Sequence, residues 1–585
     1  MTYEQRPPTP RAAATGARPT GRGALAVGGA IVGIVTALVA LGVAQLVAAI
    51  LASPIGQPVT AVGELSINNA PAAVKDFAIR EFGSNDKTVL VWGIRGVLII
   101  FAAVIGVLAI RKLWLGMAGL AVFGAIGVYA ALSQPTAKGS DALPSIIGAA
   151  VAAFALRYFS SLVRQLAQPA PQPGQPQSRA DRPPSQGTQP PAAPKSGSEG
   201  GLPPRQDPLD WRPANPVQSR ARVEPALPDR RKFLLRGVAV AGISVLAYAG
   251  GSWLANTRDV NAIQRALKLP PAAKPVPPLP AGTDLKIPGL SSFITPNSSF
   301  YRVDTAIVLP EILPAHWKLR IHGMVQKELV LTFEDLIKRP LIEDYITLCC
   351  VSNPVAGPYI GNAKWLGASL RAILQEAGIK AGADQLFCTS SDGFTSGTPV
   401  QTAMDGRDAL LAVAMNDAAL PVEHGFPARL VIPGLYGYVS ACKWIVDIEV
   451  TTYAANQAYW VPRGWDQISP VKTESRIDVP TGLNPIKAGK QTSIAGVAWA
   501  QHKGIEAVEV RVAKGPWREA KLAAVPGIDT WRQWVYEWTA DVRPGNYLVE
   551  ARATDKTGYT QTALQEPPAP NGASGYPQVL LNVVA

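Results

Sequence analysis

Two adjacent cysteines, Cys349 and Cys350, end an apolar stretch that begins at Tyr345. A cysteine thiolate is a soft ligand, which suits a molybdenum or copper centre. A cysteine at such a place is more often a small buried hydrophobic residue, and two neighbours can also form a disulfide with each other. The other two cysteines are Cys388 and Cys442, and no C-x-x-C spacing occurs. Zinc binding and thioredoxin-like chemistry are therefore not favoured, and both a metal role and a structural role stay open for the pair.

Several short segments, in the same order along the chain, resemble motifs of the sulfite-oxidase family. The segments are Phe300–Thr305, Thr347–Asn353, Ala363–Ala368, Leu420–Gly434 and Gly437–Trp444. The second resembles the family's Thr-Leu-x-Cys-x-x-Asn motif, and Cys350 stands where the family has its molybdenum ligand. The resemblance extends from about residue 294 to the C-terminus. It implies a molybdopterin-dependent oxidoreductase, in which a pterin cofactor carries the metal.

The resemblance also implies which residues contact the cofactor. His424 and Arg429 correspond to residues that bind the pterin, and Lys443 corresponds to the lysine that holds its phosphate. The full set of expected cofactor-binding residues is Tyr301, Arg302, Asp304, Asn353, Thr389, Ser391, His424, Arg429, Gly437, Ser440, Cys442 and Lys443. The expected catalytic residues are Cys350, as the metal ligand, and Arg463, as a charge directed at an anionic substrate.

These residue types fit the cofactor, because its phosphate and its dithiolene are anionic and need fixed donors. Arg429 can form a bidentate fork, and Lys443 supplies a point charge. His424 is a donor whose charge changes near neutral pH. Each of the three also has a simpler interpretation: a structural histidine, an arginine in a surface ion pair and a solvated lysine on a strand.

The first matching segment departs from the family pattern. Sulfite oxidases bind the substrate anion with an arginine, but Val303 stands at that position and Arg302 precedes it. In a strand, a shift of one residue turns a side chain to the opposite face. Asp304 and Thr305 replace the family's Asn-His pair, and Trp465 replaces its catalytic tyrosine. These differences argue against sulfite as the substrate and leave cofactor binding unaffected.

A haem site is not evident in the sequence. There is no C-x-x-C-H motif. The four histidines are His316, His322, His424 and His502, and none lies in an apolar stretch that could cross a membrane. We therefore expect electrons to pass to or from an external carrier.

Four apolar stretches near the N-terminus each approach the length of about 20 residues that crosses a bilayer. They are Leu25–Leu51, Val89–Ile110, Leu115–Leu132 and Ile146–Val163. Hydrophobic residues make up 48% of the 585 residues, which is unusual for a purely soluble protein. Basic residues precede the first stretch and follow the second and the fourth, so these places are predicted to face the cytoplasm. Such basic flanks account for the net charge of +13 better than nucleic-acid binding does, because aromatic and basic residues do not interleave.

A further membrane-directed segment lies beyond the four stretches. Residues 165–228 are rich in Pro, Gln, Ser and Gly, and this composition predicts a flexible linker. Asp229–Arg236, with its paired arginines, and the apolar run Gly237–Leu254 resemble a twin-arginine export signal. A fifth membrane span with an ordinary basic flank is the alternative. Both interpretations predict a multi-pass protein of the plasma membrane with its catalytic part on the extracytoplasmic side.

The rest of the chain is predicted to form two domains. Strand-like runs between residues 293 and 455 alternate with helical ones, which predicts a mixed α+β molybdopterin-binding domain. The helical runs include Thr332–Lys338, Ala368–Ala377 and Gly406–Ala414. From about Thr481, short alternating runs separated by Gly and Pro turns predict an immunoglobulin-like β-sandwich. In the family that the chain resembles, this sandwich mediates dimerisation, which implies a homodimer through the C-terminal domain.

The expected organisation is therefore multi-domain. It comprises a cytoplasmic basic arm at 1–23, an α-helical membrane region at 24–164, a linker at 165–228, a signal or fifth helix at 229–256, a tether at 257–290, the catalytic domain at 291–470 and the sandwich at 471–585.

We expect a membrane-anchored molybdopterin enzyme that transfers an oxygen atom, or its equivalent, to or from a small substrate. Two alternatives stay open. One is a reductase of oxidised methionine in proteins, as in a periplasmic branch of the family. The other is a metal-free envelope scaffold that kept the fold, although the retention of Cys350, His424, Arg429 and Lys443 argues against it.

Overall fold

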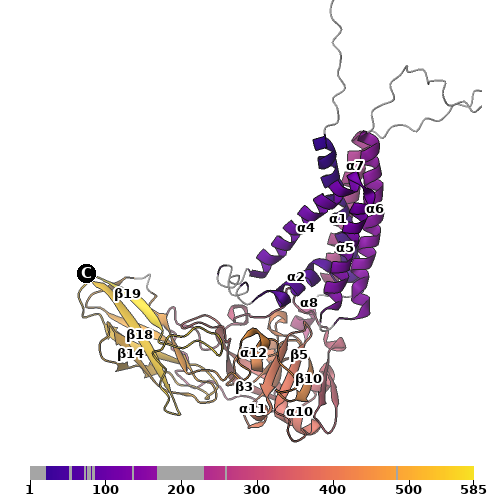
Figure 1. Cartoon of the computed structure of the whole chain (residues 1–585). Helices are drawn as coiled ribbons and strands as arrows, with labels where there is room; N and C mark the ends of the chain where they lie inside the picture. The colour runs from indigo at the N-terminus through magenta and orange to yellow at the C-terminus, as the bar shows by residue number, and fades with distance from the viewer. Residues whose placement is uncertain are drawn as a thin grey trace, which may run out of the picture.

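The computed structural model describes residues 22–51, 56–71, 74, 81, 86–134, 137–167, 230–256, 260–481 and 485–585. Figure 1 shows three parts: a bundle of long helices, a central region of mixed helices and strands, and a C-terminal region of strands. Most of the predicted basic arm, nearly all of the predicted linker and the first residue of the twin-arginine-like segment lie outside the described residues.

Four helices of the bundle are long and apolar enough to cross a membrane, over Leu25–Ile50, Thr88–Arg111, Leu113–Leu132 and Gly139–Gln165. They correspond to α1 (Arg22–Ile50), α4 (Asp86–Arg111), α5 (Leu113–Leu132) and α6 (Leu143–Ala167), close to the four predicted stretches. Glycines bring α1 and α4 together, since a Cβ at Gly33 would overlap the backbone of Ala102. Such small residues let apolar helices pack closely in a bilayer, where the hydrophobic effect does not drive their association.

Two further helices of the described part of the chain pack against these four. α7 (Arg230–Asn256) packs against α1 and carries the shorter apolar stretch Val238–Gly251. The short helix α2 (Pro58–Asn69) packs against α5 and α4. In Figure 1 the start of α1 lies at one end of the bundle, and α2 lies at the other end, beside the central region.

Two sheets form the central region. The first has the order β2–β1–β10–β5–β6 and consists of β1 (Lys318–Gly323), β2 (Leu329–Thr332), β5 (Gln385–Ser390), β6 (Thr395–Pro399) and β10 (Ile445–Thr451). The second has the order β3–β4–β7–β8, with β9 paired to β7. It consists of β3 (Leu341–Cys349), β4 (Ile360–Ser369), β7 (Leu410–Met415), β8 (Ala418–Ala419) and β9 (Arg429–Val431). The short helices are α9 (Phe333–Ile337), α10 (Leu370–Ala377), α11 (Val400–Met404) and α12 (Gly437–Ser440).

The mixed α+β character of the central region agrees with the prediction, but one predicted element is wrong. The run Gly406–Ala414 was expected to be helical and instead contains most of β7. Every residue of β7 is buried, and the strand lies between β4 and its partners β8 and β9. A short apolar run that is buried on both faces lacks the alternation that separates a strand from a helix, so its sequence is ambiguous.

The C-terminal region consists of two sheets that share a core. Their orders are β11–β13–β17–β16 and β12–β19–β18–β14–β15. The strands are β11 (Glu474–Val479), β12 (Ile486–Lys487), β13 (Gln491–Trp499), β14 (Ile505–Val512), β15 (Arg518–Glu519), β16 (Lys521–Leu522), β17 (Arg532–Thr539), β18 (Gly545–Asp555) and β19 (Gln578–Val584). Ile494 and Trp534 of one sheet pack in one core with Val508, Ala551 and Leu581 of the other. The prediction of a sheet-rich C-terminal region is confirmed.

Residues 260–290 lie along the central region rather than apart from it. α8 (Val260–Ala266) buries Val260 in a core cluster that also contains Phe300 and Trp365. Farther on, the Ala273 amide donates to the carbonyl of Leu341 at 2.8 Å, at the start of β3. This segment therefore holds the central region close to the end of α7.

Candidate active site

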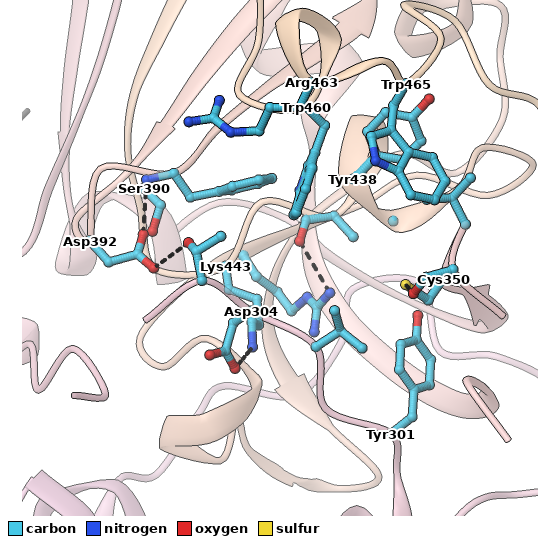
Figure 2. Close-up of a pocket in the computed structure, with 18 of the residues that line it drawn as sticks. Tyr301, Asp304, Cys350, Ser390, Asp392, Tyr438, Lys443, Trp460, Arg463 and Trp465 are labelled. Carbon is cyan, nitrogen blue, oxygen red and sulfur yellow. Dashed lines mark hydrogen bonds and ion pairs between the residues drawn. The ribbon is translucent and has the colours of Figure 1, made fainter. Parts of the chain in front are cut away.

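One cavity of about 580 Å³ gathers most of the predicted site residues, and its size is typical of small-molecule sites. The predicted residues that line it are Tyr301, Asp304, Cys350, His424, Arg429, Gly437, Lys443 and Arg463. Its other lining residues include Val303, Ser352, Ser390, Asp392, Tyr438, Trp460 and Trp465. Figure 2 shows that these side chains converge from loops that are far apart in the sequence.

Cys350 follows β3 and begins the turn that leads to β4. Its amide donates to the carbonyl of Tyr359 at 2.9 Å, and the Asn353 side chain accepts from the Tyr359 amide at 2.8 Å. These bonds fix the turn and present the Cys350 Sγ to the cavity, 2.9 Å from the Ser352 hydroxyl. All four cysteines are free, so Cys349 and Cys350 do not form the disulfide considered above. Burial raises the pKa of the Cys350 thiol.

Tyr301 lies next to Cys350 in the lining of the cavity, and Figure 2 shows its hydroxyl directed toward the sulfur. Burial raises the pKa of Tyr301 well above its usual value, and the nearby Cys350 and Cys349 act in the same direction. The phenol therefore stays protonated at neutral pH. It offers a fixed hydrogen-bond donor beside the sulfur.

Arg429 begins β9 and is buried at the wall of the cavity. Its guanidinium donates to the carbonyls of His424 at 3.1 Å and Ala441 at 3.3 Å and lies over the Trp365 ring, 5.2 Å from its centre. Burial lowers the pKa of Arg429 to about 10, so the group remains charged at neutral pH. Among the described residues, no carboxylate lies within ion-pair distance of it. A buried cation without an acidic partner is the expected form of a site that binds an anion.

Lys443 is the second buried cation of the cavity, and it does have a partner. Its Nζ lies 2.8 Å from Asp304 Oδ2 and 3.0 Å from the carbonyl oxygen of Glu423. Burial lowers the pKa of Lys443 to about 8, and Asp304 opposes that shift. The ammonium group is thus held in place, and most of it remains charged at neutral pH.

His424 is neutral in this environment. Burial lowers the pKa of His424 to about 4, and the charge of Arg429 acts in the same direction. Its Nε2 lies 3.2 Å from the carbonyl oxygen of Asn297, an acceptor, so this nitrogen carries the proton. The ring also packs edge-on against Phe300. His424 therefore has a structural contact on one side and faces the cavity on the other.

Aromatic and apolar side chains form the opposite wall of the cavity. Trp460 and Trp465 pack edge to face at 6.2 Å between ring centres, and Tyr438 lies 6.1 Å from Trp465. Val303 also lines the cavity, whereas the neighbouring Arg302 does not, although this segment is not a β-strand. Arg463 lies over the Tyr459 ring at 3.7 Å, at the edge of this wall (Figure 2).

Six predicted residues do not line the cavity: Arg302, Asn353, Thr389, Ser391, Ser440 and Cys442. Arg302 pairs with Asp304 from outside at 2.7 Å, Asn353 holds the turn after Cys350, and Ser440 donates to the carbonyls of Leu435 and Tyr436. The resemblance places Thr389, Ser391 and Asp392 together as a further cofactor contact, and of these three only Asp392 lines the cavity. Ser390, at the end of β5, lines it as well, and the chain then turns, with the Gly393 amide donating to the carbonyl of Ser390 at 3.0 Å.

The sequence reasoning also missed several lining residues. Tyr438, Phe394 and Trp460 line the cavity, and the aromatic-rich run Tyr459–Trp465 was the available signal for the last of them. Ala70, at the end of α2, lines the cavity as well. Nothing in the sequence indicated that this residue would meet a loop more than two hundred positions away.

The cavity fits an anionic cofactor that brings a soft metal. Arg429 lacks a carboxylate partner among the described residues, and Lys443 lies on the same cavity. Burying an unpaired charge costs several kcal/mol, which a bound anion would offset. Cys350 presents a thiol to the same space, and a thiolate is a suitable ligand for a soft metal.

Comparison with known proteins agrees with this chemistry. Residues 306–460 match the family described as oxidoreductase molybdopterin binding domain. Sulfite oxidase of Gallus gallus is 29% identical over 314 residues, which cover 45% of this chain and 67% of that protein. The uncharacterized oxidoreductase YuiH of Bacillus subtilis is 32% identical over 149 residues, which cover 26% of this chain and 72% of that protein.

The chain is also similar to a crystal structure of the sulfane dehydrogenase SoxCD from Paracoccus pantotrophus, with 25% sequence identity and a TM-score of 0.44. The match covers 51% of this chain and 85% of that chain. The chain spans about half the length of several mitochondrial sulfite oxidases that it also matches. The matched residues include His424, Arg429 and Cys350 of the cavity. The chain belongs to the sulfite-oxidase-type family of molybdopterin-dependent oxidoreductases.

Proposed function

We propose that this chain is a membrane-anchored molybdenum enzyme that transfers an oxygen atom, or its equivalent, to or from a small substrate. One observation carries the proposal: Cys350 and the buried cation Arg429, which has no carboxylate partner among the described residues, line the same cavity. A thiol for the metal and a cation for the anionic cofactor are the two features that this chemistry requires.

Five residues of the cavity have a proposed task. Cys350 holds the metal, Arg429 and His424 bind the pterin, and Lys443 binds its phosphate. When bound, the cofactor supplies a molybdenum centre that exchanges electrons and an oxygen atom with the substrate. The Tyr301 hydroxyl, protonated because its pKa is raised by burial, offers a hydrogen bond beside Cys350.

The substrate end of the cavity argues for a reactant other than sulfite. Val303 supplies an apolar surface there, and Trp460 and Trp465 extend it. Arg463 remains as a cation at the edge of the aromatic wall, where it can attract the polar part of a substrate. Electrons are exchanged with a carrier outside the chain.

We also propose that α1, α4, α5 and α6 cross the plasma membrane and that the central region lies on its extracytoplasmic side. The basic residues near the ends of the apolar stretches support this orientation. α7, with its paired arginines, acts as an uncleaved twin-arginine signal or as a fifth span. The central region, 291–470, is the catalytic domain, and the C-terminal region, 471–585, is an immunoglobulin-like domain through which two chains dimerise.

Elemental analysis of the full chain tests the proposed function. The protein is purified in detergent from a host that makes the cofactor, next to a known molybdenum enzyme as a loading control. We expect nearly one molybdenum per chain and a released pterin. A folded sample with neither, from a host that loads the control enzyme, would contradict the proposal and favour a metal-free scaffold.

A further inference from the structure

A short helix that packs against two of the membrane-type helices contributes one residue to the wall of the active-site cavity. α2 packs against α4 and α5, and its C-terminal cap residue, Ala70, lines the cavity. At Gly63, near the middle of α2, a Cβ would lie 2.7 Å from Cδ1 of Ile307 in the central region and 3.5 Å from Cδ1 of Ile94 in α4. The backbone of α2 is therefore held between the bundle and the segment that carries Tyr301, Val303 and Asp304.

A second connection holds the central region at the same end of the bundle. α7 ends at Asn256, and α8 begins at Val260. With about 3.8 Å between successive Cα atoms, these two residues are at most about 15 Å apart. α8 is anchored, because Val260 is buried in the core and the Gln264 side chain donates to the carbonyl of Ala419 at 2.7 Å. The central region thus cannot move far from the ends of the membrane helices.

The segment that approaches α2 also carries exposed apolar side chains. Val303 lines the cavity and is nevertheless 45% exposed, and Val308, one residue beyond Ile307, is 41% exposed. Trp460 and Trp465 line the same cavity, as does Cys350. Exposed valines beside a cavity are poorly suited to a small hydrated anion. They suit a reactant that has an apolar part to bury.

We propose that the cavity opens at the membrane surface, beside α2, and binds an amphipathic molecule dissolved in the bilayer. Its apolar part lies against Val303, Trp460 and Trp465, and its polar end reaches toward Cys350. The membrane concentrates such a molecule at its surface, and α2 holds the cavity where the molecule can enter without crossing water. This inference deepens the proposed function and rests on it for the identity of the site.

The contact between α2 and Ile307 is tested by cross-linking in the full chain. Cysteines replace Gly63 and Ile307, and a protease site is inserted in the Pro-rich segment 165–228. The native cysteines are all buried, so the single variants Gly63→Cys and Ile307→Cys serve as controls. With a short bifunctional thiol reagent, we expect the two halves of the double variant to stay joined after cleavage. Separation of the halves in the double variant, as in the controls, would overturn the proposed position of α2.

The ligand class is tested by photolabelling of the full chain in phosphatidylcholine vesicles, with an aryl diazirine that carries a dodecyl chain. Its methyl homologue is the comparison probe. We expect the dodecyl probe to label peptides that contain Val303 or Trp460 at least tenfold more than the homologue does. Val303→Asp should remove most of this label, whereas Val330→Asp, at an exposed valine of β2, should leave it unchanged.

Equal labelling by the two probes, or labelling that Val303→Asp leaves intact, would overturn the inference. Molybdenum is measured in the same samples, which separates the two proposals. Protein that contains molybdenum but is not labelled by the dodecyl probe contradicts only the proposal that the ligand is dissolved in the membrane. Protein that takes the label but contains no molybdenum contradicts the proposed function instead.

Discussion

The Lys443 ammonium lies 2.8 Å from the carboxylate of Asp304, and both side chains are nearly buried, with 11% and 3% of their surfaces exposed. Arg302 approaches the same carboxylate from outside, at 2.7 Å. Asp304 thus lies between two cations and fixes the direction of Lys443. The other buried cation of the cavity, Arg429, has no such partner among the described residues. Two buried cations of one cavity therefore differ in how their charge is balanced.

The first prediction concerns Lys443, the cation that is paired with Asp304. Asp304→Asn removes one member of a buried ion pair and leaves Lys443 without a counter-charge. We expect the free energy of unfolding of the cofactor-free protein to fall by about 3 kcal/mol. The change is measured by denaturant titration in detergent. Glu328→Gln, which breaks the exposed pair with Arg320, is the control and should cost less than about 1 kcal/mol. Equal effects of the two substitutions would contradict the burial argument.

The second prediction concerns Arg429. Arg429 has no carboxylate partner among the described residues, so Arg429→Met should not leave an unpaired buried charge. The cofactor-free variant should therefore still fold. The pterin and molybdenum contents should nevertheless fall at least tenfold, because the anion loses its unpaired cation. Arg407→Met is the matched control: Arg407 is paired with Asp405 and lies outside the cavity. That variant should retain the cofactor. If both variants keep it, Arg429 is not a cofactor ligand.

The third prediction concerns the metal. Cys350→Ser replaces a soft sulfur with a hard oxygen at the cavity and should reduce molybdenum to background. Cys388→Ser changes another buried cysteine, which neither lines the cavity nor belongs to the expected cofactor-binding residues, and it should leave the metal content unchanged. The molybdenum content of both variants is measured by elemental analysis of folded protein. Molybdenum retained in Cys350→Ser would refute the ligand assignment.

Sequence reasoning succeeded where side-chain pattern and local structure coincide. The strands of the C-terminal region alternate in hydrophobicity, and the region predicted to be sheet-rich from about Thr481 does consist of strands. The prediction failed for β7, because this strand is buried on both faces and is apolar throughout. Its sequence therefore lacks the alternation of apolar and polar residues that distinguishes a strand from a helix.

Within the site, the motifs identified Cys350, Arg429 and Lys443, which line the cavity, but they did not indicate Ser390. The chain turns directly after Ser390, and the side chains that a turn presents to a cavity do not follow a strand pattern. The presence of Ala70 in the cavity wall depends on packing between distant parts of the chain. No local pattern reports such a contact.

The fourth prediction concerns pH and the junction between the central and C-terminal regions. Asp344 in β3 is largely buried near Asp529 and Asp408, and the Thr347 amide of the same strand donates to the carbonyl of Asp529 at 2.9 Å. Burial, with help from these two carboxylates, raises the pKa of Asp344 to about 7. In the unfolded chain an aspartate titrates near pH 4.

Between these two values the folded state therefore holds a proton that the unfolded state has lost, and stability falls as the pH rises. We expect the unfolding free energy of the wild type to drop by about 2 kcal/mol from pH 5 to pH 8 because of this group. Asp344→Asn cannot ionise and still accepts the Tyr345 amide, so its stability should depend less on pH and exceed the wild type's at pH 8. Asp541→Asn, at an exposed carboxylate, should keep the wild-type profile. Parallel profiles for wild type and Asp344→Asn would show that Asp344 is ionised in the folded protein throughout this range.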